Sequence, residues 1–149
     1  MRFEGIYTPL IAPFYSDFTL NSDAMASAID FLVDTGVHGI IVAGTTGEYY
    51  AMSMKERVFL MNRVKELLND RLPMIVGTGA IRTEDSIEYA KQARIAGADA
   101  IMIATPPYAY PTGREIALHA LAIDRAANLP VILYNYCLLY TSPSPRDVR

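Results

Sequence analysis

Hydrophobic residues along the chain alternate between short continuous runs and longer amphipathic stretches. The short runs are rich in β-branched residues and lie at residues 5–12, 38–43, 73–77, 98–104 and 130–135. Runs of this length suit strands better than helices. Because they are nearly continuous in apolar residues, they are typical of parallel strands that are covered on both faces. The pattern therefore predicts five parallel strands.

The amphipathic stretches between these runs predict helices, and local signals mark their ends. Capping boxes, in which Ser or Thr is followed three residues later by Glu, open the second and fourth stretches at Ser53 and Thr112. Glycines suited to a left-handed C-terminal cap follow the first and third stretches, at Gly36 and Gly97. The inward faces are predicted to comprise Met25, Ala28, Ile29, Leu32, Val33, Val58, Met61, Val64, Leu68, Ile87, Ala90 and Ala93. The expected order is βαβαβαβαβ.

Repeated βα units build either an open doubly wound sheet or a closed eight-stranded barrel. A barrel needs about 250 residues, so 149 residues supply about half of one, whereas a flavodoxin-like five-stranded sheet would fit the length. No glycine-rich dinucleotide or phosphate fingerprint follows the first strand. Polar and glycine residues gather after several strands, where barrel enzymes place their chemistry. We predict an α/β fold, a partial TIM (β/α)₈ barrel of about four βα units plus a fifth strand, over residues 1–136.

Residues 137–149 break the pattern, because they contain two prolines and neither a helical stripe nor a cap. Two interpretations compete: a short native C-terminal tail, or foreign residues joined by truncation or read-through. The abrupt change within a strand–loop motif favours the second, a non-native or disordered tail.

Composition narrows the function classes. The chain is 52% hydrophobic and 19% charged, with a net charge of −3, which gives no basic surface for nucleic acid or an anionic membrane. With one cysteine and two histidines far apart in sequence, neither a disulfide nor a metal site is expected. No signal peptide and no apolar run of the roughly 20 residues that span a bilayer is present, so a cytoplasmic protein is the default. No cofactor is expected.

Three motifs that follow predicted strands could carry chemistry. Gly-Thr-Thr-Gly-Glu at residues 44–48 could form an anion-binding loop, although a tight loop that caps a short helix is an equal alternative. Thr-Pro-Pro-Tyr at residues 105–108 could aim a tyrosine, or serve only as a rigid packing loop or subunit contact. Tyr134 and Asn135 end the fifth strand, where Tyr134 could face the barrel mouth or pack in the core. Together, at the same ends of successive strands, they indicate a site.

In order and spacing, residues 44–48, 105–108 with Pro111, and 133–135 resemble the signatures of the dihydrodipicolinate synthase/N-acetylneuraminate lyase family. The likeness spans about residues 4–136. It implies a pyruvate-dependent class I aldolase, a homo-oligomer such as a homotetramer, in which a lysine of the sixth strand forms a Schiff base with a keto acid. It also implies that Tyr134 is the acid/base and that Thr45 links Tyr134 to Tyr108 in a proton relay. Thr46, with Gly47, would bind the substrate carboxylate.

Some positions depart from the family pattern. Ala12 replaces the usual Thr near the first strand, and Asp17-Phe18 replaces an Asp-Gly turn. Position 107 is Pro where many synthases have Tyr. Lys55, Lys65 and Lys91 all fall in predicted helices, which excludes them as the Schiff-base residue. His119, in the fourth predicted helix, is expected to pack rather than to catalyse.

Two classes of function follow. The intact protein would be a carbon–carbon lyase or synthase acting on pyruvate, similar to 4-hydroxy-tetrahydrodipicolinate synthase; a 2-keto-3-deoxy sugar acid aldolase or dehydratase, or a neuraminate lyase, stays open. Thr45 leans toward the synthase branch, since the lyases more often have Ser there. Alternatively, the polypeptide is a truncated, catalytically inactive fragment.

Overall fold

The predicted order of elements is confirmed. A computed structural model describes residues 3–107, 109 and 111–135. The strands are β1 (Tyr7–Pro9), β2 (Gly39–Val42), β3 (Met74–Gly77), β4 (Ala100–Ala104) and β5 (Val131–Tyr134). The helices are α1 (Ser22–Asp34), α2 (Met54–Leu68), α3 (Thr83–Ile95) and α4 (Gly113–Ala127). Two short 3-10 helices, η1 (Thr45–Gly47) and η2 (Tyr49–Ala51), follow β2.

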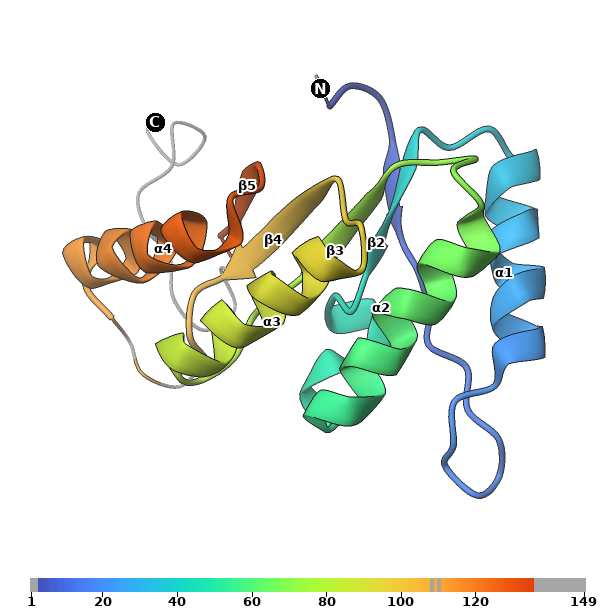
Figure 1. Ribbon diagram of the computed structural model, residues 1–149, viewed down its shortest axis with the longest axis horizontal. Coiled ribbons are helices and arrows are strands. Elements are labelled where there is room, and N and C mark those ends of the chain that lie inside the picture. Colours follow the sequence, from blue (N-terminus) through green and yellow to red (C-terminus); the bar gives the residue numbers. More distant parts are fainter. Residues whose placement is uncertain (1–2, 108, 110, 136–149) are drawn as a thin grey trace, which may run out of the picture.

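The five strands form one parallel sheet in the order β1-β2-β3-β4-β5. The four helices lie along one side of this sheet (Figure 1). A flavodoxin-like sheet would have the order 2-1-3-4-5 with helices on both faces, so that alternative is wrong. Strands in chain order with helices on one outer side are the arrangement of a (β/α)₈ barrel, and the chain forms half of one.

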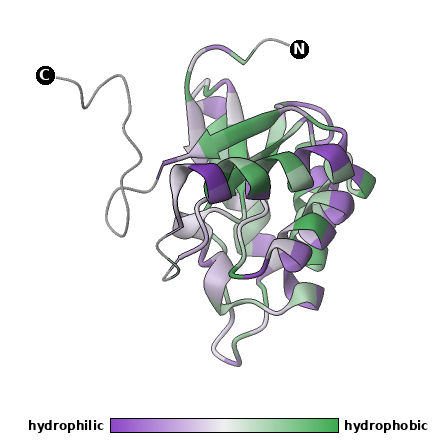
Figure 2. Cartoon of the chain, turned by 90° about the vertical axis from the view of Figure 1, so that its left-hand side faces the viewer, coloured by the Kyte–Doolittle hydropathy of each residue, from purple (hydrophilic) through white to green (hydrophobic). Residues whose placement is uncertain are grey.

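The main core lies between the sheet and the helices. Alternate strand residues such as Ile40, Val42 and Val76 are fully buried there, as the two-residue period of a strand requires. Met25 of α1 and Met61 of α2 are equally inaccessible and belong to the same cluster. Figure 2 shows the strands as hydrophobic and the helices as mixed, with polar residues on their outer sides. The predicted helical faces are therefore confirmed in the main.

The other residues of each strand face the inside of the half-barrel. The register pairs Pro9 with Ile41 and Met102 with Ile132, on the side opposite the main core. Tyr7 also lies on this inner face, and its ring covers Gly39 so closely that a Cβ there would overlap it. The inner face is thus mostly apolar, and it extends to the carboxyl ends of the strands, where the motifs lie.

Caps that the sequence predicts mark the ends of the helices. Both capping boxes form reciprocally, at Ser53 with Glu56 and at Thr112 with Glu115. Gly36 has a φ of +75° after α1. The hydrogen bonds of the caps satisfy backbone groups that would otherwise have no partner. They set where each helix begins and ends against the sheet.

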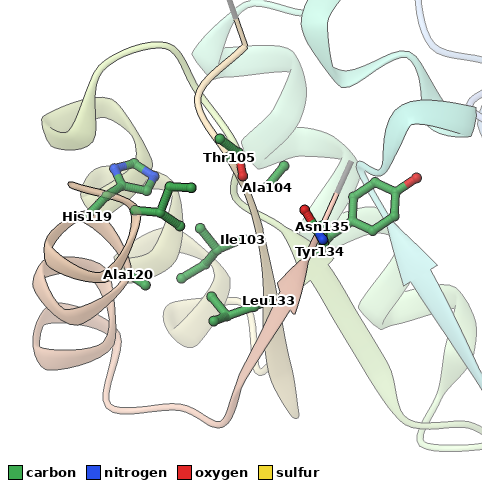
Figure 3. Close-up of a pocket in the computed structure, with 9 residues that line it drawn as sticks. Ile103, Ala104, Thr105, His119, Ala120, Leu133, Tyr134 and Asn135 are labelled. Carbon is green, nitrogen blue, oxygen red and sulfur yellow. The ribbon is translucent and has the colours of Figure 1, made fainter. Parts of the chain in front are cut away.

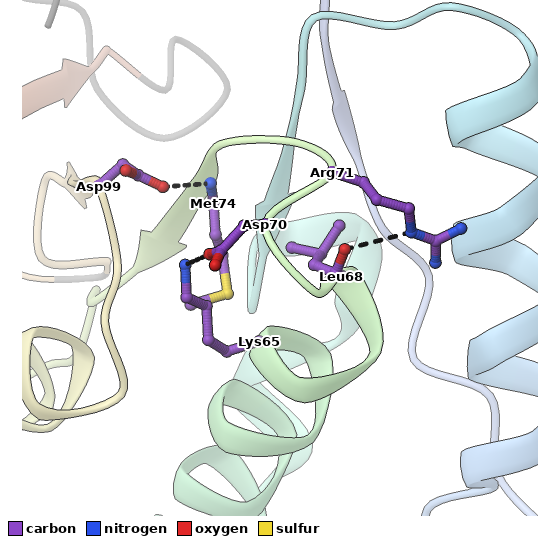
Figure 4. Close-up of polar contacts among 6 residues, drawn as sticks. All are labelled: Lys65, Leu68, Asp70, Arg71, Met74 and Asp99. Atoms are coloured by element: carbon purple, nitrogen blue, oxygen red, sulfur yellow. Dashed lines mark hydrogen bonds and ion pairs between the residues drawn. The ribbon is translucent and has the colours of Figure 1, made fainter.

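Polar contacts at the amino ends of the strands support the fold (Figure 4). Lys65 binds Asp70 with an Nζ–Oδ1 distance of 2.8 Å. The Asp99 carboxylate accepts a hydrogen bond from the Met74 amide at 2.8 Å, at the start of β3. These contacts lie at the end opposite the motifs, where barrels carry stability rather than chemistry.

Among the residues that the structure describes, no helix is long and apolar enough to cross a bilayer. The prediction that residues 137–149 are a separate tail falls outside the described residues, and it stays a prediction.

Candidate active site

A small pocket opens at the carboxyl ends of four neighbouring strands. It is lined by Ala43, Gly44, Thr45, Tyr49, Gly77, Gly79, Met102, Ala104 and Tyr134. Thr45 and Tyr134 come from the loop after β2 and from the last residue of β5, respectively. Because all strands are parallel, their carboxyl ends meet at one edge, and residues far apart in sequence come together there.

The loop after β2 takes a tight turn that presents its threonines to solvent. Ala43 has a φ of +54°, and the chain then enters η1. Backbone bonds from the Gly47 amide to Gly44 O and from the Glu48 amide to Thr45 O close the turn, each at 3.0 Å. Gly47 is buried, and a Cβ there would lie 3.0 Å from the carbonyl oxygen of Leu10. Only glycine fits without a backbone shift, so Gly47 shapes this loop.

The loop after β3 packs directly under the loop after β2. A Cβ on Gly77 would overlap the carbonyl of Ala43, so this contact requires glycine. Thr78 is fully buried, and its amide donates to Met102 O of β4 at 3.0 Å. A Cβ on Gly79 would be 3.6 Å from the phenol oxygen of Tyr49. The two loops therefore form one continuous wall of the pocket.

Tyr134 and its neighbours on β5 point to opposite sides of the strand (Figure 3). Tyr134 is 39% exposed and points away from α4, whereas Leu133 points toward α4. On the α4 side, Leu133, Ile103 and Ile116 line a second, largely apolar pocket. The alternation of the strand thus directs the Tyr134 ring to the inner face, and the residue also borders the second pocket.

Of the predicted site residues, only some line the pocket. Thr45 and Tyr134 share the pocket, whereas Thr46 is exposed in the same 3-10 turn and is not among the pocket residues. Gly47 is buried beneath the turn. Tyr108 lies outside the described residues, so its predicted part in a relay stays a prediction. Hydroxyl groups at the pocket can transfer protons without carrying a permanent charge, which suits acid/base chemistry on a neutral carbonyl.

Sequence reasoning missed Arg57, the most buried charged residue of the described chain. Arg57 is 2% exposed and donates to the carbonyls of Gly77 at 2.8 Å and Gly79 at 3.0 Å. Burial lowers the pKa of its guanidinium below the usual value. The available signal was its spacing, because Arg57 shares the apolar face of α2 with Met61 and Val64. A charged residue on such a face needs a partner inside.

The lysines lie away from the pocket, as predicted. Lys55 and Lys65 belong to α2 and Lys91 belongs to α3, and none of them lines the pocket. His119 of α4 is 6% exposed, and its Nδ1 lies 2.9 Å from Thr83 Oγ1 at the start of α3. His119 therefore joins two helices on the outer ring, which agrees with the packing role predicted for it.

Comparison with known proteins places this architecture in a family. The family model described as "Dihydrodipicolinate synthetase family" matches residues 2–141. The chain is 38% identical over 135 residues to 4-hydroxy-tetrahydrodipicolinate synthase of Bacillus subtilis, covering 91% of this chain and 47% of that protein. The chain thus spans about half the length of the curated relatives it matches.

Solved structures of related proteins share this fold. YagE, a prophage protein from E. coli K12 in complex with pyruvate, superposes with a TM-score of 0.90 at 29% identity, over 93% of this chain and 47% of YagE. Dihydrodipicolinate synthase from Acinetobacter baumannii, complexed with pyruvate, gives a TM-score of 0.85 at 34% identity, over 89% of this chain and 45% of the enzyme. With the family model matching nearly the whole chain and the fold shared, this chain belongs to the dihydrodipicolinate synthetase family.

Proposed function

We propose that the intact protein is a carbon–carbon lyase or synthase that acts on pyruvate through a lysine Schiff base, similar to 4-hydroxy-tetrahydrodipicolinate synthase. The observation that carries the proposal is the meeting of Thr45 and Tyr134 at one pocket. Two of the related structures hold pyruvate, which supports a keto acid as the ligand. A cytoplasmic location and a homo-oligomeric assembly, for example a homotetramer, belong to the same proposal.

In this proposal each residue has a distinct task. Tyr134 donates and accepts protons beside the imine, and Thr45 connects its hydroxyl to Tyr108. The turn at residues 44–48 receives the carboxylate, with Thr46 and Gly47 supplying the hydroxyl and the backbone. An unperturbed tyrosine titrates near pH 10, so a chain of neutral hydroxyls moves protons at neutral pH without leaving a charge behind.

The nucleophilic lysine is proposed to come from a later strand of the intact protein. All three lysines of this chain lie in α2 and α3, outside the pocket. An amine nucleophile forms an imine with the keto acid and divides a difficult carbon–carbon step into easier ones. The chain by itself is therefore proposed to be catalytically inactive, although it contributes one wall of the site.

Trapping with borohydride tests whether the Schiff-base lysine lies outside this chain. The chain incubated with pyruvate and borohydride is expected to gain no adduct by intact-mass spectrometry, whereas the intact protein gains one, on a lysine beyond this chain. An adduct on Lys55, Lys65 or Lys91 would overturn the assignment of the nucleophile. An intact protein that forms no adduct would overturn the Schiff-base proposal itself.

Substitution of the tyrosine tests the acid/base assignment. In the intact protein, Tyr134→Phe should lower kcat by roughly 100-fold or more, on the scale of general acid–base catalysis, while the pyruvate adduct still forms. Tyr15→Phe is the matched control, since Tyr15 is exposed in the loop before α1 and is not a pocket residue. Equal activity of Tyr134→Phe and the wild type would contradict the role.

A further inference from the structure

Arg57 is a buried cation that has no anionic partner among the residues that the structure describes. Within the described part of the chain, its guanidinium forms no ion pair with a carboxylate, and its Nε has no hydrogen-bond partner. Removing a charge from water without a counter-ion carries a large free-energy penalty compared with the marginal stability of a domain. The contacts that Arg57 does make must therefore offset a large penalty.

Those contacts join four segments of the chain. Two nitrogens of the guanidinium donate to the carbonyls of Gly77, the last residue of β3, and Gly79, on the loop that follows. The guanidinium carbon lies 3.4 Å from the ring centroid of Tyr89, on α3, and 5.1 Å from that of Tyr49, on η2. Such cation–π contacts strengthen when they are desolvated. One side chain of α2 thus binds α3 and the loops after both β2 and β3.

Three of the four residues that Arg57 contacts also line the candidate active site. Gly77, Gly79 and Tyr49 all belong to the pocket that contains Thr45 and Tyr134. Gly77 in turn packs against the carbonyl of Ala43, immediately before the turn that carries Thr45. The guanidinium therefore sits behind the pocket wall, whereas the substrate side of that wall carries the hydroxyl groups.

We infer that Arg57 is a positioning residue of the active site. By holding the carbonyls of Gly77 and Gly79 and the ring of Tyr49, it fixes the loop after β3 under the loop after β2. That contact places Thr45 relative to Tyr134. The geometric part of the inference stands on this chain alone, and its consequence for a keto acid ligand rests on the proposed function.

Hydrogen exchange tests the geometric part on the 149-residue chain. Arg57→Met keeps an unbranched apolar side chain but removes both donors, and Arg57→Lys keeps the charge with a compact ammonium that lacks the planar fork. Met61→Ala, one turn further along the same face of α2 and fully buried, is the control for lost stability without a lost contact to the loops. The reporters are the amides of Gly47, Glu48 and Thr78, whose hydrogen bonds close the two loops.

In Arg57→Met, protection of these three amides should fall roughly tenfold or more relative to core amides of α2, on the scale of one charge-assisted hydrogen bond. Arg57→Lys should fall between Arg57→Met and the wild type, and it carries the test if Arg57→Met does not fold. Met61→Ala should lower protection throughout the chain in proportion to its free energy of unfolding. If the Arg57 variants show that same proportional loss, Arg57 is only a stability residue and the inference is overturned.

Pyruvate binding, followed by NMR titration, gives the functional readout. Arg57→Lys should weaken binding several-fold, whereas Met61→Ala should leave it unchanged at a temperature where both are folded. If the wild-type chain and the intact protein both fail to bind pyruvate, the proposed function fails, and the exchange experiment still decides the positioning role. Unchanged binding in Arg57→Lys, with unchanged exchange, would overturn the inference.

Discussion

At the scale of single residues, Phe18 shows a conformation that its side chain disfavours. It has a φ of +65° at the tip of the loop between β1 and α1, and its side chain is 82% exposed. The loop is closed by bonds from the Phe18 amide to Tyr15 O at 3.0 Å and from the Tyr15 amide to Thr19 O at 2.8 Å. The ring is too exposed to compensate for the strained backbone.

Phe18→Gly should therefore stabilise the chain by about 1 kcal/mol. Glycine removes the cost of a left-handed conformation for a residue with a Cβ, but it also raises the conformational entropy of the unfolded chain, which cancels part of the gain. Urea unfolding followed by circular dichroism measures the change. Phe18→Ala removes the ring but keeps the Cβ, so it should alter the free energy of unfolding little. Equal stabilisation by both variants would mean that the exposed ring, and not the backbone, is responsible.

His119 gives the chain a pH-dependent stability. Desolvation by burial lowers its pKa below the usual value of 6.5. The unfolded chain therefore takes up a proton at a higher pH than the folded chain does, and the stability contributed by neutral His119 is complete above about pH 6.5. As the pH falls from there toward the lowered pKa, this contribution is lost, and it stays lost below that pKa.

Urea unfolding of the wild type between pH 8 and pH 5 should show this loss, and His119→Gln should reduce the slope. The matched control is Leu118→Gln, because Leu118 is exposed on the same helix and does not titrate. That variant should keep the pH dependence of the wild type in this window. A slope that is unchanged in His119→Gln would assign the effect to other groups.

At the scale of elements, the start of α2 depends on a local motif. Ser53 Oγ accepts from the Glu56 amide at 3.3 Å, and the Glu56 carboxylate accepts from the Ser53 amide at 2.7 Å. The hydrogen bonds from the side chain and backbone of Ser53 lower the pKa of Glu56. Since Arg57 lies in the first turn of α2, the cap also fixes the position of its backbone relative to the loop after β3.

Ser53→Ala should lower the free energy of unfolding by about 1 kcal/mol, as lost N-caps do. Ser27→Ala in α1 is the control, because Ser27 is exposed and its hydroxyl only bonds back to Asp23 O within the same helix. It should change stability by a few tenths of a kcal/mol at most, as surface substitutions usually do. Thermal and urea denaturation of both variants measures the difference. Equal effects would show that the cap contributes nothing specific.

At the scale of the whole molecule, the sheet presents two edges and an open inner face. Within the described residues, β1 and β5 each pair with one neighbour only. Ile6 beside β1 and Leu133 on β5 are 64% and 62% exposed. Unpaired strand edges beside exposed apolar side chains favour association.

The 149-residue chain should therefore self-associate or be poorly soluble. Sedimentation velocity at several concentrations should show a weight-average sedimentation coefficient that rises with concentration. Leu133→Lys places a charge on the edge strand and should reduce this rise. Leu121→Lys is the control, since Leu121 is 47% exposed on α4 rather than on a strand edge. A cooperative, concentration-independent monomer would contradict the prediction.

The sequence by itself determined which elements form and in what order. The apolar runs became β1 to β5, and the boxes at Ser53 and Thr112 opened α2 and α4. These outcomes follow from local rules, because strand and helix periods and end caps involve residues only a few positions apart. Likewise, the parallel order of the strands indicated that the loops at their carboxyl ends would come together, and Thr45 and Tyr134 do line one pocket there.

Only the tertiary structure decided what supports that site. Arg57 contacts Gly77 and Gly79 at the end of β3, Tyr49 of η2 and Tyr89 of α3, which come from three separate parts of the chain. The requirement for glycine at position 77 comes from the carbonyl of Ala43, which directly follows the neighbouring strand β2, and no local pattern contains that contact. Packing between segments depends on the distances that the tertiary fold imposes, whereas the sequence records only the residue types that make such packing possible.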